Sequence, residues 1–301
     1  MRAHRPPSRG AALVLAMLLT AFGAAVAAQM LAPIADWLAR ERRGNDLNSA
    51  YTLGDAAAAW ALTVLAADRL RGDADHAREP WATRLPATAI EGGVLEGYLT
   101  DLQGRFNLNS LAPRGQSSAV AIAAGRRVFA ALGVRPDLAD LIADAIDTDD
   151  LSASGQSERQ AWGAVLPNRA LEDLSALRQL PGVSAADIAR LAGRVTVLPN
   201  ATAVNVNTAE PWLLQALLTD IDATALARLL AERETRPVSS VAELRARLGA
   251  ALPEGLLGVG SEYFALEARV RYGSVDHRLQ LKIHRPPTAR PSILSRLTTH
   301  G

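Results

Sequence analysis

The chain begins with a short basic stretch and continues into a long run of apolar residues. No charged side chain occurs between Arg9 and Asp36, a span of 26 residues. As a helix at about 1.5 Å per residue, this run would measure about 39 Å, enough to cross a bilayer core of about 30 Å. The pattern therefore predicts a transmembrane helix, which we place at residues 11–35.

The charges before this run predict its orientation. Arg2, Arg5 and Arg9 precede it, and positive residues beside a membrane helix favour the cytoplasmic side. We therefore expect a cytoplasmic N-terminus and a body outside the cytoplasm. A cleaved secretory signal is the alternative, because the small residues at 24–28 would suit a signal peptidase, although such signals have a shorter apolar core of about 7 to 15 residues.

The hydrophobic period changes three times beyond the apolar run. It stays helical through Leu53, Ala57 and Trp60, becomes strand-like at residues 94–100, and is helical again over most of residues 119–249. Alternation returns at 262–272 and 277–283 around Gly273, which predicts an antiparallel hairpin. The order predicts an α+β protein whose long N-terminal helix lies on a small antiparallel sheet, with a large helical insertion.

These changes of pattern divide the chain into segments. We expect a leader at 1–10, the membrane helix at 11–35, and the first part of the sheet domain at 36–111. The helical insertion covers 112–255, in two halves at 112–203 and 204–255, and the last strands cover 256–285. Residues 286–301 contain three prolines and no periodicity, so they predict a loose C-terminal tail.

Composition narrows the chemistry. The net charge is +1, so no strong field attracts the protein to nucleic acid. Cysteine is absent, which excludes disulfides, thiolate metal sites and cysteine nucleophiles. The five histidines lack metal-ligand spacing, and the sequence contains no G-x-S-x-G, P-loop or G-x-G-x-x-G motif. We therefore predict no enzymatic activity. The asparagines of 107–109 and 205–207 have two interpretations, polar site residues or side chains that bond turns to the domain backbone, and we expect the second.

The densest acidic cluster follows the predicted helix that ends near Ile146. Counting Asp147 as position 1 places Asp149 at position 3 and Glu158 at position 12, the carboxylate spacing of a calcium loop. Leu151 and Ser152 at positions 5 and 6 depart from an EF-hand, and Asp150 is out of its register. The spacing leaves two interpretations open, a calcium site or a solvated acidic loop that caps the helix.

A second motif lies in the middle of the insertion. Residues 180–187, LPGVSAAD, look like the turn of a helix-hairpin-helix, with Ser184 and Asp187 spaced to form a capping box. Few basic residues surround the turn, so we expect protein contacts rather than nucleic-acid binding.

Together these features resemble the type II secretion system protein K family of minor pseudopilins. The resemblance covers nearly the whole chain. It rests on the Arg9-Gly10 leader end before the apolar run, DLQGRFNLN at 101–109, DTDD at 147–150, PNR at 167–169, LPGV at 180–183, VNVNTA at 204–209 and SEYF at 261–264.

The resemblance implies a pilin-like sheet domain interrupted by an inserted helical domain of SAM-like or helix-hairpin-helix-like type. It implies that prepilin peptidase cuts after Gly10, so that Ala11 becomes the first residue and the membrane helix is retained. This helix would serve both as anchor and as assembly surface, through Leu13, Leu15, Leu18, Phe22 and Gly23. Small residues such as Gly23 favour helix packing in lipid.

Leu15 is the fifth residue after the expected cut, where most pilin-like subunits carry Glu. A glutamate carboxylate is unfavourable in lipid, and pairing with the N-terminal amine of the subunit ahead reduces this cost. Its absence fits a subunit with none ahead, although Leu15 is also an ordinary membrane residue.

The resemblance further implies a place at the tip of the periplasmic pseudopilus, anchored in the inner membrane, where the protein nucleates assembly. The implied partners are the minor pseudopilins I and J and the major pseudopilin, with secreted substrates or the outer-membrane secretin as further candidates. It also implies a structural Ca²⁺ held by Asp147, Asp149, Asp150 and Glu158. The rival hypothesis is an exported helix-hairpin-helix binding protein whose signal peptide is removed.

Overall fold

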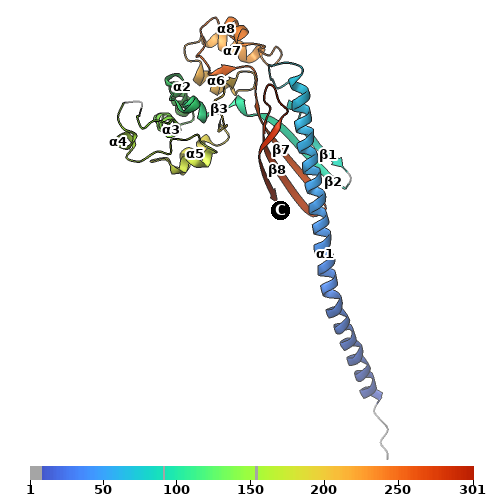
Figure 1. Ribbon diagram of the computed structural model, residues 1–301. Helices are drawn as coiled ribbons and strands as arrows, with labels where there is room; N and C mark the ends of the chain where they lie inside the picture. Colours follow the sequence, from blue (N-terminus) through green and yellow to red (C-terminus); the bar gives the residue numbers. More distant parts are fainter. Residues whose placement is uncertain (1–8, 91, 153–154) are drawn as a thin grey trace, which may run out of the picture.

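The computed structural model describes residues 9–90, 92–152 and 155–301. Its longest element is α1 (Arg9–Arg69), whose N-terminal half projects away from the rest of the protein (Figure 1). The first buried side chain along the described part of this helix is Ala50. From there Ala57, Ala61 and Leu65 continue one buried face at helical spacing. Because alanines form most of this face, the helix lies close to the sheet that it covers.

The sheet has five antiparallel strands in the order β1-β2-β7-β8-β9. Strands β7 and β8 form the predicted hairpin, and Gly273 adopts a φ of 51° in its turn. The side chains of β8 alternate, and Leu279, Leu281 and Ile283 face the core shared with α1. The strands are β1 (Leu85–Ile90), β2 (Gly93–Asp101), β7 (Tyr263–Tyr272), β8 (Val275–His284) and β9 (Ser292–His300).

The predicted C-terminal tail at 286–301 is wrong for most of its length. Ser292–His300 forms β9, which pairs with β8 from His284↔Ser292 to His277↔His300. All but one of its residues are exposed, because β9 is an edge strand. It therefore lacks the alternation of buried and exposed residues by which the other strands are recognised.

The helical insertion connects β2 to β7, which are neighbours in the sheet with Asp101 opposite Phe264. Its helices surround a separate hydrophobic core that includes Phe106, Phe129 and Leu214. The helices are α2 (Ala119–Ala131), α3 (Leu138–Ile146), α4 (Glu158–Trp162), α5 (Ala185–Leu191), α6 (Pro211–Leu217), α7 (Ala223–Glu232) and α8 (Val241–Leu248). The helical character predicted for most of residues 119–249 is confirmed, with one segment, η5 (Leu174–Gln179), forming a 3₁₀ helix.

Each half of the insertion begins with a short parallel strand pair, followed by an asparagine whose side-chain amide bonds to the backbone of a distant residue. A two-residue parallel pair joins β3 (Phe106–Asn107) to β4 (Val195–Thr196), and another joins β5 (Val204–Asn205) to β6 (Leu257–Gly258). Asn109 exchanges hydrogen bonds with the backbone of Leu171, and Asn207 does the same with Val238. The structural use predicted for these amides is confirmed, and the repeat supports a division near residue 203.

Buried polar groups fix the insertion on the sheet. Asp101, at the end of β2, accepts hydrogen bonds from Asn205, Thr208 and Ser261 at 2.9, 2.6 and 2.7 Å. Because Asp101 is buried and these partners belong to the insertion and its exit, the network sets the position of one core relative to the other.

Candidate functional site

The free half of α1 is an extended apolar surface. Leu13, Leu15, Leu18 and Phe22 are exposed by 61–70% of their area, and a Cβ added at Gly23 would meet nothing within 4 Å. This helix is long and apolar enough to cross a membrane, and none of its most apolar stretch is buried. The residues predicted to anchor and assemble the protein therefore lie on a surface that the rest of the described chain leaves uncovered.

The residues predicted for processing lie at the start of this helix. Gly10 and Ala11 are exposed in the first turn of α1. Residues 1–8 of the predicted leader lie outside the described residues. Cleavage between Gly10 and Ala11 stays a prediction.

The acidic loop begins where α3 ends. Asp147 is the C-cap of that helix and is buried, and its Oδ2 accepts a 2.6 Å hydrogen bond from Ser117. Glu158 opens α4 and is also buried, and its N–H donates to the Asp150 carbonyl at 3.0 Å. This backbone bond and the bridge between Leu151 and Ser157 fold the loop back on itself. Glu158 is thereby brought beside Asp147.

Three of the four predicted ligands meet. One carboxylate oxygen each from Asp147, Asp149 and Glu158 lies within 4.8 Å of the others. The fourth, Asp150, is not in this group, and its Oδ1 instead accepts a 3.2 Å hydrogen bond from Asn168. The spacing of positions 1, 3 and 12 therefore identified the residues that converge.

The electrostatics of this group favour a cation. Burial, followed by the charges of four neighbouring aspartates, raises the pKa of Glu158 to about 7. Burial also raises the pKa of Asp147, against the lowering effect of its bond from Ser117. Among the described residues, neither Asp147 Oδ1 nor Glu158 Oε1 has a hydrogen-bond partner, although both atoms are buried. Buried oxygens without donors fit a hard cation such as Ca²⁺, which takes oxygen ligands.

Sequence reasoning missed one acidic member of this region. Asp144 lies on α3 one turn before Asp147, is buried, and accepts a 2.7 Å hydrogen bond from the Trp162 indole. Its charge contributes to the raised pKa of Glu158. The signal was present in the sequence, because residues three apart on a helix share a face.

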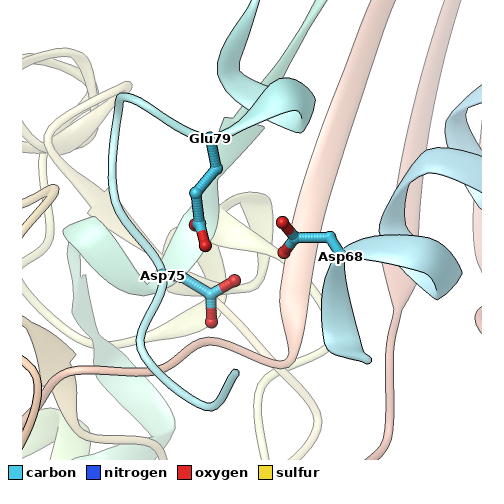
Figure 2. A group of neighbouring side chains, drawn as sticks. All are labelled: Asp68, Asp75 and Glu79. Atoms are coloured by element: carbon cyan, nitrogen blue, oxygen red, sulfur yellow. The ribbon is translucent and has the colours of Figure 1, made fainter. Parts of the chain in front are cut away.

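A second acidic group lies where α1 ends. Asp68, Asp75 and Glu79 point toward one another (Figure 2). Arg285 supplies the positive charge here, since its guanidinium lies 2.8 Å from Asp68 and 2.5 Å from Asp75. Glu79 accepts hydrogen bonds from the Trp81 indole and the His76 N–H, each 2.8 Å long. The arrangement is an ion-pair cluster in which Arg285 already neutralises carboxylate charge, so a metal ion is not needed to do so.

The helix-hairpin-helix-like turn is structural in the described chain. Ser184 and Asp187 form the predicted capping box at the start of α5. Gly182 adopts a φ of 69° in the turn, which a side chain would strain.

A long helix with a free apolar half, laid on an antiparallel sheet, fits the class of membrane-anchored proteins built like pilins. Two family models, both described as type II secretion system protein K, match residues 104–200 and 204–266. The chain is 29% identical to type II secretion system protein K of Pseudomonas aeruginosa, covering 97% of this chain and 93% of that protein. It is 30% identical to the Klebsiella pneumoniae protein of that name, covering 79% and 78%. The chain belongs to the type II secretion system protein K family, and its role is that of a minor pseudopilin.

A solved structure agrees with the fold. A chain of the GspK-GspI-GspJ complex of the enterotoxigenic Escherichia coli type 2 secretion system superposes with a TM-score of 0.71 at 24% identity. The match covers 86% of this chain and 99% of that chain. The family and the apolar helix together fit a single-pass inner-membrane protein.

Proposed function

We propose that the protein stands at the tip of the periplasmic pseudopilus and nucleates its assembly with minor pseudopilins I and J. The observation that carries this proposal is the free half of α1, an apolar helix with no buried side chain before Ala50 in the described chain. Such a surface gains free energy when other helices cover it. The solved relative is a complex with GspI and GspJ, which supports these two partners.

The same proposal includes maturation and orientation. Prepilin peptidase removes residues 1–10, Ala11 becomes the N-terminus, and the body faces the periplasm. Leu15 carries no charge that a subunit ahead would have to neutralise, which supports a terminal position. The major pseudopilin would then follow beneath the tip, and the helical insertion would face the secretin or exported proteins. We assign the protein no reaction of its own and no nucleic-acid partner.

Copurification tests the assembly role. Gly23→Leu should lower the amount of I and J that copurifies with the full-length protein, because a leucine prevents close helix approach. A Cβ at Gly23 meets nothing within 4 Å, so the fold itself accepts the change. Gly72→Leu is the matched control, since Gly72 lies beyond α1 and is equally unobstructed. Undiminished recovery of I and J with Gly23→Leu would contradict the proposed surface.

The mature N-terminus decides between the two maturation hypotheses. Mass spectrometry of protein from membranes should find a chain that begins at Ala11. A soluble chain beginning near Gln29 would support the exported helix-hairpin-helix binding protein instead and remove the assembly role.

We further propose that Asp147, Asp149 and Glu158 hold a structural Ca²⁺, with Asp150 placing the loop. The two buried carboxylate oxygens without donors support this assignment. Calcium would neutralise the repulsion between these carboxylates and so hold α3, the loop and α4 together.

We also propose that the insertion is of SAM-like type. The matching backbone bonds of Asn109 and Asn207, one in each half, support this assignment.

A further inference from the structure

A cavity of about 630 Å³ opens in the helical insertion beside the acidic loop. Its walls include the turn at Arg114–Gly115, the loop at Asn168–Ala170 and the stretch Pro199–Ala201. Asn109, Ala112, Ile146 and Thr148 complete the lining. Its size lies within the range of about 300–1,000 Å³ that is typical of ligand sites. Nothing in the proposed assembly role uses this cavity.

Two strained residues define its walls. Among the described residues, the non-glycine residues with positive φ are Arg114 at 57° and Asn168 at 44°, and both line the cavity. Such conformations cost free energy and concentrate at functional sites. Asn168 and Gly115, the residue after Arg114, make hydrogen bonds to the acidic loop. The Gly115 carbonyl accepts from the Thr148 N–H at 3.0 Å, and the Asn168 amide donates to the Asp149 carbonyl at 2.7 Å.

The lining is positive and has unused hydrogen-bonding capacity. No described carboxylate lies within 4.0 Å of the Arg114 guanidinium. Arg169 has only an exposed contact of 3.8 Å with Glu172, which is worth little in water. The side-chain NH₂ of Asn200 donates to the Tyr263 hydroxyl at 3.3 Å, which leaves the side-chain amide oxygen available to an N–H group. Ala112, Ala170 and Ala201 add small apolar surfaces between these polar groups.

We propose that this cavity binds the carboxylate of an acidic polypeptide segment. The planar guanidinium groups of Arg114 and Arg169 recognise the carboxylate, and Asn200 accepts a hydrogen bond from the backbone beside it. A polypeptide fits this lining because it offers an N–H donor and a carboxylate a few ångströms apart. The inference rests on the proposed tip position, where exported or structural polypeptides would reach the insertion.

The acidic loop makes this binding sensitive to calcium. Thr148 lines the cavity and lies between Asp147 and Asp149 in sequence. Without a cation these carboxylates repel an incoming carboxylate, and Ca²⁺ on the loop would cancel much of that repulsion. Calcium therefore strengthens the interaction, and the bound segment strengthens calcium binding by the same factor.

Surface plasmon resonance tests the proposal with the full-length protein in detergent and 1 mM CaCl₂ over immobilised ten-residue peptides. One peptide has two central glutamates and blocked ends, and one has glutamines in their place. The third has no charged side chain and a blocked amino end, so that its free carboxyl terminus is its one charged group. We expect binding to the glutamate or free-terminus peptide, which distinguishes the two sources of the carboxylate, and none to the glutamine peptide. Arg114→Gln with Arg169→Gln should weaken binding at least about tenfold, since charge-assisted bonds are lost. Arg228→Gln, an exposed arginine on α7, should change nothing.

Equal binding of the glutamine peptide, or wild-type binding by the double variant with an unchanged circular dichroism spectrum, overturns the proposal. Chelation with EDTA provides a separate result. If EDTA leaves the affinity unchanged while the arginine variants reduce it, the coupling between calcium and the peptide is refuted and the carboxylate site stands. Because the assay contains no I or J, the assembly role is tested independently by their copurification.

Discussion

Arg285 and Asp68 form a buried ion pair, with Nη1 2.8 Å from Oδ2, although 217 residues separate them in the sequence. The other terminal nitrogen of Arg285 lies 2.5 Å from Asp75 and 2.7 Å from the Ser261 carbonyl. One side chain at the end of β8 therefore joins the end of α1 to the segment that returns from the insertion. All three charged groups are at most 3% exposed, so their charges are stabilised mainly by one another and little by water.

Replacing Arg285 should destabilise the whole protein. Arg285→Met leaves two buried carboxylates without a counter-charge, and breaking such a pair costs about 3–5 kcal/mol. Chemical denaturation of the full-length protein in micelles, followed by circular dichroism, measures the loss. The loss should shrink at low pH, because burial raises the pKa of Asp75 to about 7 and this carboxyl group then takes up a proton.

Arg278→Met is the matched control for this change. Arg278 is 63% exposed and its contact with Asp276 is 3.8 Å long, so we expect less than about 1 kcal/mol. Equal effects of the two substitutions would show that the buried cluster does not support the junction.

Replacing the side-chain amide of Asn109 by a carboxylate should lower the stability of the protein. Its NH₂ group donates to the carbonyls of Leu171 and Leu198 at 2.9 and 2.8 Å, and its oxygen accepts from the Leu171 N–H. Asn109→Asp turns a carboxylate toward two buried carbonyls and should cost at least about 3 kcal/mol at neutral pH. Asn45→Asp, at an exposed position on α1, should cost almost nothing, and tryptophan fluorescence during denaturation compares the two. A small cost at Asn109 would mean that the loops rearrange around it.

The local pattern of the chain was enough to predict most helices and the β7–β8 hairpin. The helix α3 ends at Ile146, as predicted, because apolar residues recur along it at helical spacing up to that point. β9 could not be predicted, because an edge strand with both faces exposed shows no alternation. The η5 segment was predicted only as a helix, since the choice between 3₁₀ and α geometry depends on packing.

Contacts between distant residues account for what the sequence did not show. The spacing of carboxylates identified Asp147, Asp149 and Glu158, because all three lie in one short loop. The use of Asp150 depended on Asn168, and the pairing of Arg285 with Asp68 depended on the completed fold. Neither relationship has a periodic signal, so only the structure revealed them.

Calcium should stabilise the protein through the acidic loop. We expect millimolar Ca²⁺ to raise the melting temperature of the full-length protein, because a ligand that binds only the folded state stabilises it by mass action. Glu158→Gln and Asp147→Asn should each remove most of that increase. Asp137→Asn, an exposed aspartate at the start of α3, is the control and should retain it. Differential scanning calorimetry measures all four proteins.

The affinity for calcium should also depend on pH. The pKa of Glu158 is about 7 before a cation binds, so at pH 6 calcium must displace a proton from this carboxyl group. Affinity measured by isothermal titration calorimetry should therefore rise between pH 6 and pH 8. Unchanged melting temperature and no heat of binding at millimolar Ca²⁺ would refute the site and leave a solvated acidic loop.

His277 should make the contact between α1 and the sheet weaken in acid. Its ring is 1% exposed, lies edge-on to Tyr51 at 4.6 Å between centroids, and has no hydrogen-bond partner on either nitrogen among the described residues. Burial lowers its pKa below the ordinary value of 6.5, and the charges of Arg296 and His300 on β9 lower it further. Asp55 on α1 acts in the opposite direction, but it is engaged by Arg296 at 2.6 Å.

The sign of the pH effect follows from these groups. Below about pH 6.5 the unfolded chain binds a proton at this histidine that the folded protein does not, so the free energy of unfolding falls as the pH is lowered. His277→Leu should remove this contribution, whereas His76→Leu, at a half-exposed position, should retain it. Glu158 gives a slope of opposite sign between about pH 4.5 and 7, so the measured quantity is the difference between variant and wild type. If denaturation at pH 7 and pH 5 gives the same difference for His277→Leu, then His277 is protonated equally in the folded and unfolded states and the predicted weakening is wrong.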